Sequence, residues 1–151
     1  MRKAIIKAIA VLAFGVSSVF MASTALAEEW PLVGGDFWEV TGIDIKDGGS
    51  WKYANWLATE WKKNLEFSKS QGWIKDYMIL SNYHNRSDEA DLYLIRVMDH
   101  VPTAAEGQER QKAYIEFQKK TPEALVGESG NRAEYREVKS TSLLQVLNFR
   151  D

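Results

Sequence analysis

The amino-acid sequence predicts an α+β domain built on one antiparallel sheet with two helices on one face. Segments rich in β-branched and aromatic residues alternate with amphipathic helical segments in the order β-α-β-β-α-β. The helical segments have recognisable ends, and the two central strand segments are apolar on both faces rather than on one. These observations predict the element order, the type of sheet and a second apolar face that needs a cover.

The first 27 residues have the pattern of a cleavable export signal. Arg2, Lys3 and Lys7 form a basic start, residues 8–22 are almost wholly apolar, and residues 25–27 (Ala-Leu-Ala) match the small-x-small pattern that signal peptidases accept. The apolar run is shorter than the roughly 20 residues that span a membrane. We therefore expect cleavage after residue 27, a periplasmic or secreted protein, and no membrane association after cleavage.

The remainder has the size of one domain, with residues 28–35 as a linker and residues 36–151 as the folded part. The whole sequence has a formal net charge of −2, and loss of the basic signal makes the mature chain more acidic, which argues against nucleic acid as a partner. The sequence contains no Cys, so disulfides, thiolate metal sites and cysteine nucleophiles are excluded. The hydrophobic core alone must hold the fold.

The first strand and the first helix follow the linker. Residues 37–45 (FWEVTGIDI) are typical of a strand, and the parity of their apolar residues changes at Gly42, which predicts a β-bulge. Residues 50–70 are typical of a helix that ends before Gly72. A wide arc of aromatic and aliphatic residues lies opposite its polar arc.

Turn and helix-boundary signals place the later elements. Residues 85–88 predict a turn between the second and third strands. The pattern Thr103-Ala-Ala-Glu106 predicts a capping box at the start of the second helix. Residues 122–133 are expected to form a loop, with room for one helical turn. The two central strands, the second helix and the last strand are expected at residues 73–84, 91–101, 103–120 and 134–149.

The order β-α-β-β-α-β is the ferredoxin-like arrangement. Two helices cover one face of such a sheet, and the simplest cover for the other apolar face is a second copy of the chain. In these features the chain resembles the dimeric α/β-barrel proteins, in which two ferredoxin-like protomers pack sheet against sheet. The stretch from Phe37 to Gly48, with the Trp-rich helix after it, also resembles exported proteobacterial proteins of that fold with no assigned activity.

The resemblance implies a homodimeric barrel, but it selects no function. The wider superfamily includes cofactor-free oxygenases, haem-degrading enzymes, isomerases and small-ligand binders, and a shared fold does not decide among them. Its haem-degrading members generally use a His on a helix as the iron ligand. Neither helix predicted here contains a His, which argues against haem.

Known catalytic motifs are not found. The two histidines, His84 and His100, lie at the ends of strands, whereas a catalytic zinc needs three protein ligands on one side. The sequence has no Gly-x-Ser-x-Gly elbow and no Gly-rich phosphate loop. We therefore expect no metal and no cofactor.

The first helix carries the best candidates for a site. Glu60 and Asn64 are four residues apart, project together and lie within the aromatic arc. A carboxylate in apolar surroundings needs a partner or a proton, which suits a general base. Arg96, a charge within the apolar third strand, is the expected counter-ion. The catalytic candidates are Glu60, Asn64, Arg96 and His84, and the expected ligand contacts are Tyr53, Trp56, Trp61 and Tyr77.

Three functions fit these observations. The first is an exported homodimer that binds a small hydrophobic or aromatic molecule in a pocket between the first helix and the sheet. The second is a cofactor-independent oxygenase or isomerase that uses the Glu60 carboxylate. The third is a structural dimer in which the tryptophans fill the core and Glu60 reaches solvent. A cavity would separate the first two from the third, and burial of Glu60 beside it would favour the enzyme.

Overall fold

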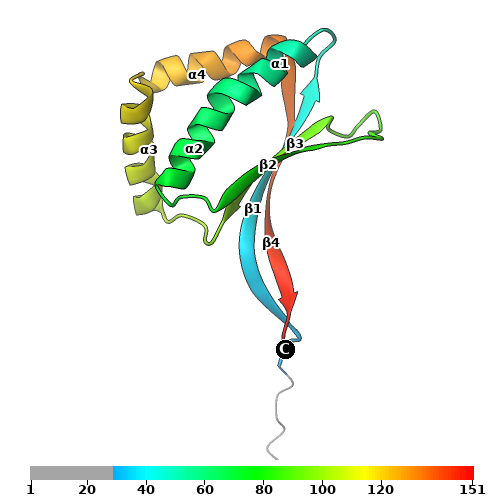
Figure 1. Cartoon of the computed structure of the whole chain (residues 1–151), viewed down its shortest axis with the longest axis vertical. Coiled ribbons are helices and arrows are strands. Elements are labelled where there is room, and N and C mark those ends of the chain that lie inside the picture. The colour runs from blue at the N-terminus through cyan, green and yellow to red at the C-terminus, as the bar shows by residue number, and fades with distance from the viewer. Residues whose placement is uncertain (1–28) are drawn as a thin grey trace, which may run out of the picture.

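The computed structural model describes residues 29–151, and the expected signal peptide lies outside the described residues. An antiparallel sheet and a group of helices make up this part of the chain (Figure 1). The elements are β1 (Leu32–Ile45), α1 (Ser50–Trp56), the π-helical η1 (Leu57–Trp61), α2 (Lys62–Ser70), β2 (Asp76–Ser81), β3 (Leu92–Met98), α3 (Ala104–Gln118), α4 (Pro122–Asn131), the 3₁₀-helical η2 (Arg132–Glu134) and β4 (Arg136–Phe149).

The four strands lie in the order β2-β3-β1-β4, and every neighbouring pair is antiparallel. The two long strands, β1 and β4, continue past the end of β3 as a two-stranded arm (Figure 1). In this arm Leu32 pairs with Phe149 and Gly34 with Leu147. Residues Leu32–Gly35, which we expected to be a linker, therefore belong to β1.

The predicted irregularity at Gly42 is confirmed. The register between β1 and β4 shifts between Gly42 and Ile43, because these consecutive residues pair with Ser140 and Val138. Lys139 is thus the extra residue, so the bulge lies opposite Gly42 on β4 rather than on β1.

The register also confirms that the central strands are apolar on both faces. Ile43, Leu94 and Met98 face the helices and are buried against residues of the first helix. On the described residues no helix packs against the opposite face (Figure 1). By their pairing, the side chains on that open face include Trp38, Val40, Met78, Ile95, Val97 and Leu144. Of these, Ile95 and Val97 are buried, whereas Leu144 is exposed.

The first helix runs from Ser50 to Ser70 as predicted, but its middle turn is π-helical. Tyr53, Leu57, Trp61 and Leu65 contact the core at every fourth residue. A regular α-helix has 3.6 residues per turn, so contacts at this spacing drift by about 40° at each step. The wider π-helical turn reverses part of that drift and keeps all four side chains toward the sheet.

The second predicted helix begins as expected, and a further helix follows it. Thr103 and Glu106 form the predicted capping box of α3. Residues 122–131, expected as a loop, form α4, because the Thr121 side chain accepts a hydrogen bond from the Ala124 N–H and Pro122 occupies the first helical turn. The expectation of two helices was therefore wrong, because α4 is an additional helix.

Candidate functional site

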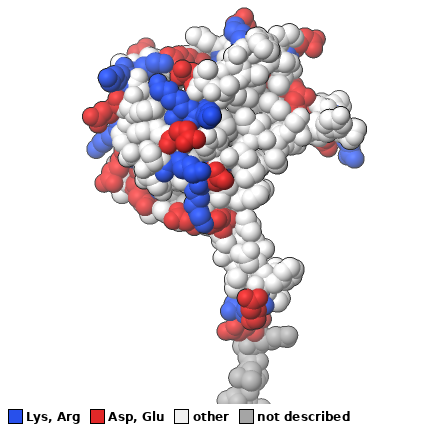
Figure 2. All heavy atoms as spheres, in the orientation of Figure 1, with Lys and Arg blue, Asp and Glu red and all other residues white. Residues whose placement is uncertain are grey.

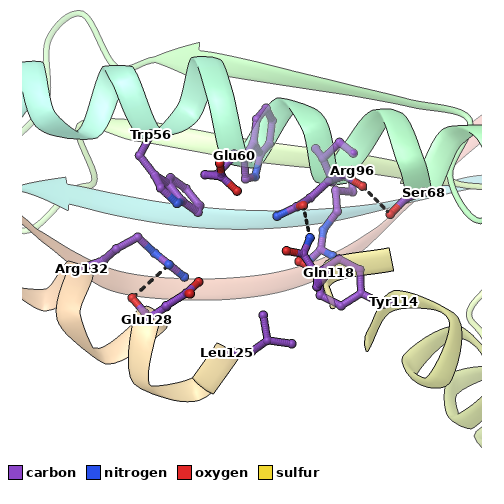
Figure 3. A pocket seen from close by; sticks show the side chains of 12 residues that line it. Trp56, Glu60, Ser68, Arg96, Tyr114, Gln118, Leu125, Glu128 and Arg132 are labelled. Atoms are coloured by element: carbon purple, nitrogen blue, oxygen red, sulfur yellow. Dashed lines mark hydrogen bonds between the residues drawn. The ribbon is translucent and has the colours of Figure 1, made fainter. Parts of the chain in front are cut away.

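A cavity of about 430 Å³ lies where the first helix meets α3, α4 and η2 (Figure 3). This volume is within the range of small-molecule sites, roughly 300–1,000 Å³. The first helix forms one wall and α4 the opposite wall. The lining residues are Trp56, Glu60, Trp61, Asn64, Leu65, Ser68, Arg96, Tyr114, Gln118, Leu125, Glu128 and Arg132.

Two tryptophans give the cavity its aromatic wall, and core packing holds both. Trp56 stacks on the buried Tyr53, with 5.6 Å between ring centroids and 8° between planes. Trp61 meets the Tyr77 ring edge to face at 5.4 Å. Because the core fixes both indoles, their exposed edges are preorganised to contact a ligand.

Polar residues at the other end of the cavity are tied to each other. The Gln118 amide on α3 donates to the Asn64 side-chain oxygen on α2, and the Ser68 hydroxyl donates to the Asn64 carbonyl oxygen at 3.0 Å. Arg96 reaches up from β3 and forms an ion pair with Glu39 on β1. Arg96 therefore lines the cavity as predicted, but Glu39 and not Glu60 is its counter-ion.

Glu60 lies in the π-helical turn and lines the cavity next to Trp56 (Figure 3). Its residue is exposed, so water reaches the carboxylate. The expected removal of this carboxylate from water is therefore not found. π-Helical turns within α-helices are frequently found at functional sites, so the position of Glu60 in such a turn keeps it a candidate site residue.

The wall formed by α4 and η2 contributes residues that the sequence reasoning missed. Leu125, Glu128 and Arg132 line the cavity from this side. Glu128 forms an ion pair with Lys120 at 2.7 Å, and the Arg132 guanidinium lies 4.3 Å from the centroid of the Trp56 ring. The signal that could have found this wall was Thr121-Pro122, an N-cap residue followed by a proline suited to a first helical turn.

The structure brings five of the predicted site residues together and separates three. Trp56, Glu60, Trp61, Asn64 and Arg96 line the cavity. Tyr53 lies in the core, 1% exposed, and burial raises its pKa to about 12. Tyr77 lines a separate apolar groove between the first helix and β2, together with Trp61 and Ile79. His84 is exposed in the loop after β2 and lines neither cavity.

The other histidine belongs to a surface cluster at the start of α3. His100 contacts the Asp99 carboxylate at 2.7 Å and the Glu106 carboxylate at 3.1 Å. Hydrogen bonds to Glu106 and Asp99 raise the pKa of His100. Hydrogen bonds that Glu106 accepts from Thr103, and then from His100, lower the pKa of Glu106 from 4.5 to about 2. This cluster caps a helix and does not touch the cavity.

Metal-binding clusters and membrane-spanning helices were also sought in the described part of the chain. Within residues 29–151, no group of three or more His, Cys, Asp or Glu side chains is arranged to hold a metal ion. None of the helices in this range is long and apolar enough to span a bilayer.

Comparison with known proteins gave no identification: no family model matches the chain, and neither do the curated proteins or the solved structures.

Proposed function

We propose that this protein is an exported homodimer of the dimeric α/β-barrel type that binds a small hydrophobic or aromatic molecule. The observation that carries the binding part is the cavity of about 430 Å³ between the first helix and α4. Trp56, Trp61, Tyr114 and Leu125 supply apolar contacts, and polar side chains from the first helix, β3, α3 and α4 converge on the same space. Ligand sites combine apolar contacts with placed polar groups that fix the orientation of the ligand.

The proposed ferredoxin-like topology has support from the sheet. The order β2-β3-β1-β4, read from the other edge, places β1 and β3 at the centre and β4 and β2 at the edges. That is the order of a ferredoxin-like sheet, in which α4 would be an addition to the basic pattern. The proposed export has its support in the basic, apolar and small-x-small pattern of residues 1–27.

The proposed dimer has support from the open face and from the arm. Apolar side chains on an open sheet face favour contact with a partner. The arm of β1 and β4 is two-stranded where it passes β3, and isolated two-stranded ribbons are marginally stable in water. Figure 2 shows few charges along this arm, and Leu147 and Phe149 on it are exposed. A second copy packed sheet to sheet would cover both.

Binding is favoured over catalysis by the position of Glu60. The enzyme hypothesis required this carboxylate to be removed from water so that it could act as a general base. Glu60 is exposed where it lines the cavity, and its four-residue neighbour Asn64 is already bonded to Gln118. The cavity itself argues against a purely structural protein with a filled core.

Tryptophan fluorescence tests the proposed binding site. Titration with small aromatic molecules should change the emission of the protein, and the change should be reduced but not abolished in Trp56→Phe, because Trp61 also lines the cavity. Trp51 is the matched control, since it lies on the same helix, is 81% exposed and does not line the cavity. Trp51→Phe should keep the response. Equal responses in both variants would place the ligand elsewhere, and no response in the unmodified protein would remove the proposal.

Two adjacent leucines on β4 test the proposed dimer. Leu144 pairs with Trp38 and so lies on the open face, while Leu143 pairs with Glu39 on the helix-facing side. Their exposures are nearly equal, 52% and 51%. Light scattering should report twice the monomer mass for the unmodified protein and for Leu143→Glu, and a monomer or aggregate for Leu144→Glu. A monomeric unmodified protein would disprove the dimer.

A further inference from the structure

We propose that the ligand of this cavity carries a carboxylate and that Arg132 is the residue that binds it. This inference rests on the proposed function, because it specifies the chemistry of the molecule in the cavity. Arg132 lines the cavity from η2, beside the C-terminal end of α4. Its guanidinium lies over the Trp56 ring, and its Nη1 donates to the Glu128 carbonyl oxygen at 3.0 Å (Figure 3).

Arg132 lacks the acceptors that a partly buried guanidinium needs. Its Nε is shielded from solvent and has no hydrogen-bond partner, and the same holds for the Nε of Arg136. Within residues 29–151, no ion pair includes either arginine. A buried donor without an acceptor costs free energy, and a buried charge without a counter-charge costs more. Because the Nε is inaccessible, an anion in the cavity would relieve the unpaired charge of the guanidinium through its Nη groups and not through the Nε.

The electrostatic surroundings of Arg132 point in the same direction. Burial, and after it the positive charge of Arg136, lowers the pKa of Arg132. Arginine nevertheless stays protonated in proteins. The group thus remains cationic where its surroundings disfavour a cation, and a bound anion would relieve this unfavourable energy.

The other charged groups of the cavity are already satisfied. Arg96 is paired with Glu39, and Glu128 is paired with Lys120. Glu60 is exposed, so water solvates its carboxylate. Among the charged residues that line the cavity, these contacts leave Arg132 as the one that still needs a counter-ion within the described chain.

The position of Arg132 over Trp56 also suggests the shape of the ligand. The guanidinium is planar, so its Nη edge suits a planar carboxylate. The body of the ligand would then extend from that edge toward Trp61 and Leu125 on the two walls. The class of ligand that fits is a small aromatic carboxylate.

Calorimetric titration of the purified protein with phenylacetate, 2-phenylethanol and 2-phenylethylamine tests this inference. The three ligands share a ring and differ in the charge of one group. We expect phenylacetate to bind roughly 10- to 100-fold more tightly than the neutral alcohol, the scale of a charge-assisted hydrogen bond. Added salt should reduce this preference. Equal binding of acid and alcohol, or tighter binding of the amine, would overturn the carboxylate and leave the proposed binding function intact. If none of the three binds, both proposals fail.

Substitution of Arg132 separates its role in binding from a role in folding. Arg132→Met should abolish the preference for phenylacetate while leaving weak binding of the alcohol. Arg110→Met is the matched control, since Arg110 also lies over an indole, that of Trp73 at 6.0 Å, and does not line this cavity. That variant should keep the preference. Arg132→Lys retains the charge without the planar fork, and we expect an intermediate preference that remains salt-dependent. An unchanged preference in both Arg132 variants would refute the assignment.

Discussion

Two glycine substitutions should change stability in opposite directions, because the space around the two glycines differs. Gly49 is buried at the start of α1, where an added methyl group would lie 2.3 Å from the Tyr135 carbonyl oxygen and 2.9 Å from that of Lys46. Both obstacles are backbone atoms, so no side-chain rotation can relieve the clash. Gly127 lies on the exposed face of α4, and a methyl group there meets nothing within 4 Å.

The magnitudes follow from these contacts. Gly49→Ala forces the turn away from Tyr135, which strains the packing by about 1–3 kcal/mol and weakens the 3.2 Å hydrogen bond from Lys46 N–H to Tyr135 by about 1 kcal/mol. We expect a loss of about 2–4 kcal/mol, or a fall in Tm of roughly 10 °C. Gly127→Ala should gain up to about 1 kcal/mol in helix propensity and raise Tm by a few degrees.

Urea denaturation and thermal melting followed by circular dichroism measure both effects. A Gly49→Ala variant as stable as the unmodified protein would show that the turn does not lie against the start of β4. Destabilisation by Gly127→Ala would show that α4 is not a regular exposed helix at that point. Either result would also undermine the cavity wall, since both substitutions report on the chain segments that hold η2 in place.

Three further predictions concern the core, the pH dependence and the first helix. Leu57→Ala should cost about 2–5 kcal/mol in urea denaturation, because Leu57 is buried in the main core cluster. Hydrogen bonds lower the pKa of Glu106 to about 2, so the contribution of Glu106 to stability is complete above pH 4.5 and is lost as the pH falls toward 2. Glu106→Gln should therefore reduce the loss of stability between pH 4.5 and 2, whereas Glu109→Gln on the same helix should not. Deleting Ala58 from the π-helical turn should leave a folded protein by circular dichroism but abolish the fluorescence response that depends on Trp56.

The four strands, the first helix, the capping box and the two-faced pattern of the central strands could be predicted because each has a local signal. Thr103 and Glu106 specify a helix start within four residues, and alternating apolar residues specify strand faces whatever the partner. The ends of the strands were harder to predict, because a strand continues only as far as the neighbouring strand with which it forms hydrogen bonds. β1 begins at Leu32 only because β4 extends to Phe149 beside it, and that pairing joins residues more than a hundred positions apart.

Only one of the two walls of the cavity could be predicted from the sequence. The aromatic arc of the first helix identified Trp56, Glu60 and Trp61, but the opposite wall lies on α4, which we interpreted as a loop. A proline after a helical segment suits the end of that helix and equally the start of the next one, so Pro122 alone does not decide between them. Gly127 and Gly130 further weakened the helical signal, because glycine is a poor helix former.

The division of the aromatic arc between core and cavity depends on the π-helical turn. Tyr53, Leu57, Trp61 and Leu65 would face the sheet in a regular α-helix if one residue between Leu57 and Trp61 were missing, since the spacing would become i, i+4, i+7, i+11. The core alone therefore does not require the additional residue. Its other effect is to place Glu60 on the cavity side of the helix, beside Trp56 (Figure 3). The helix thus accepts a wider and less favourable turn where it lines the cavity, which supports the proposal that this irregularity also serves binding.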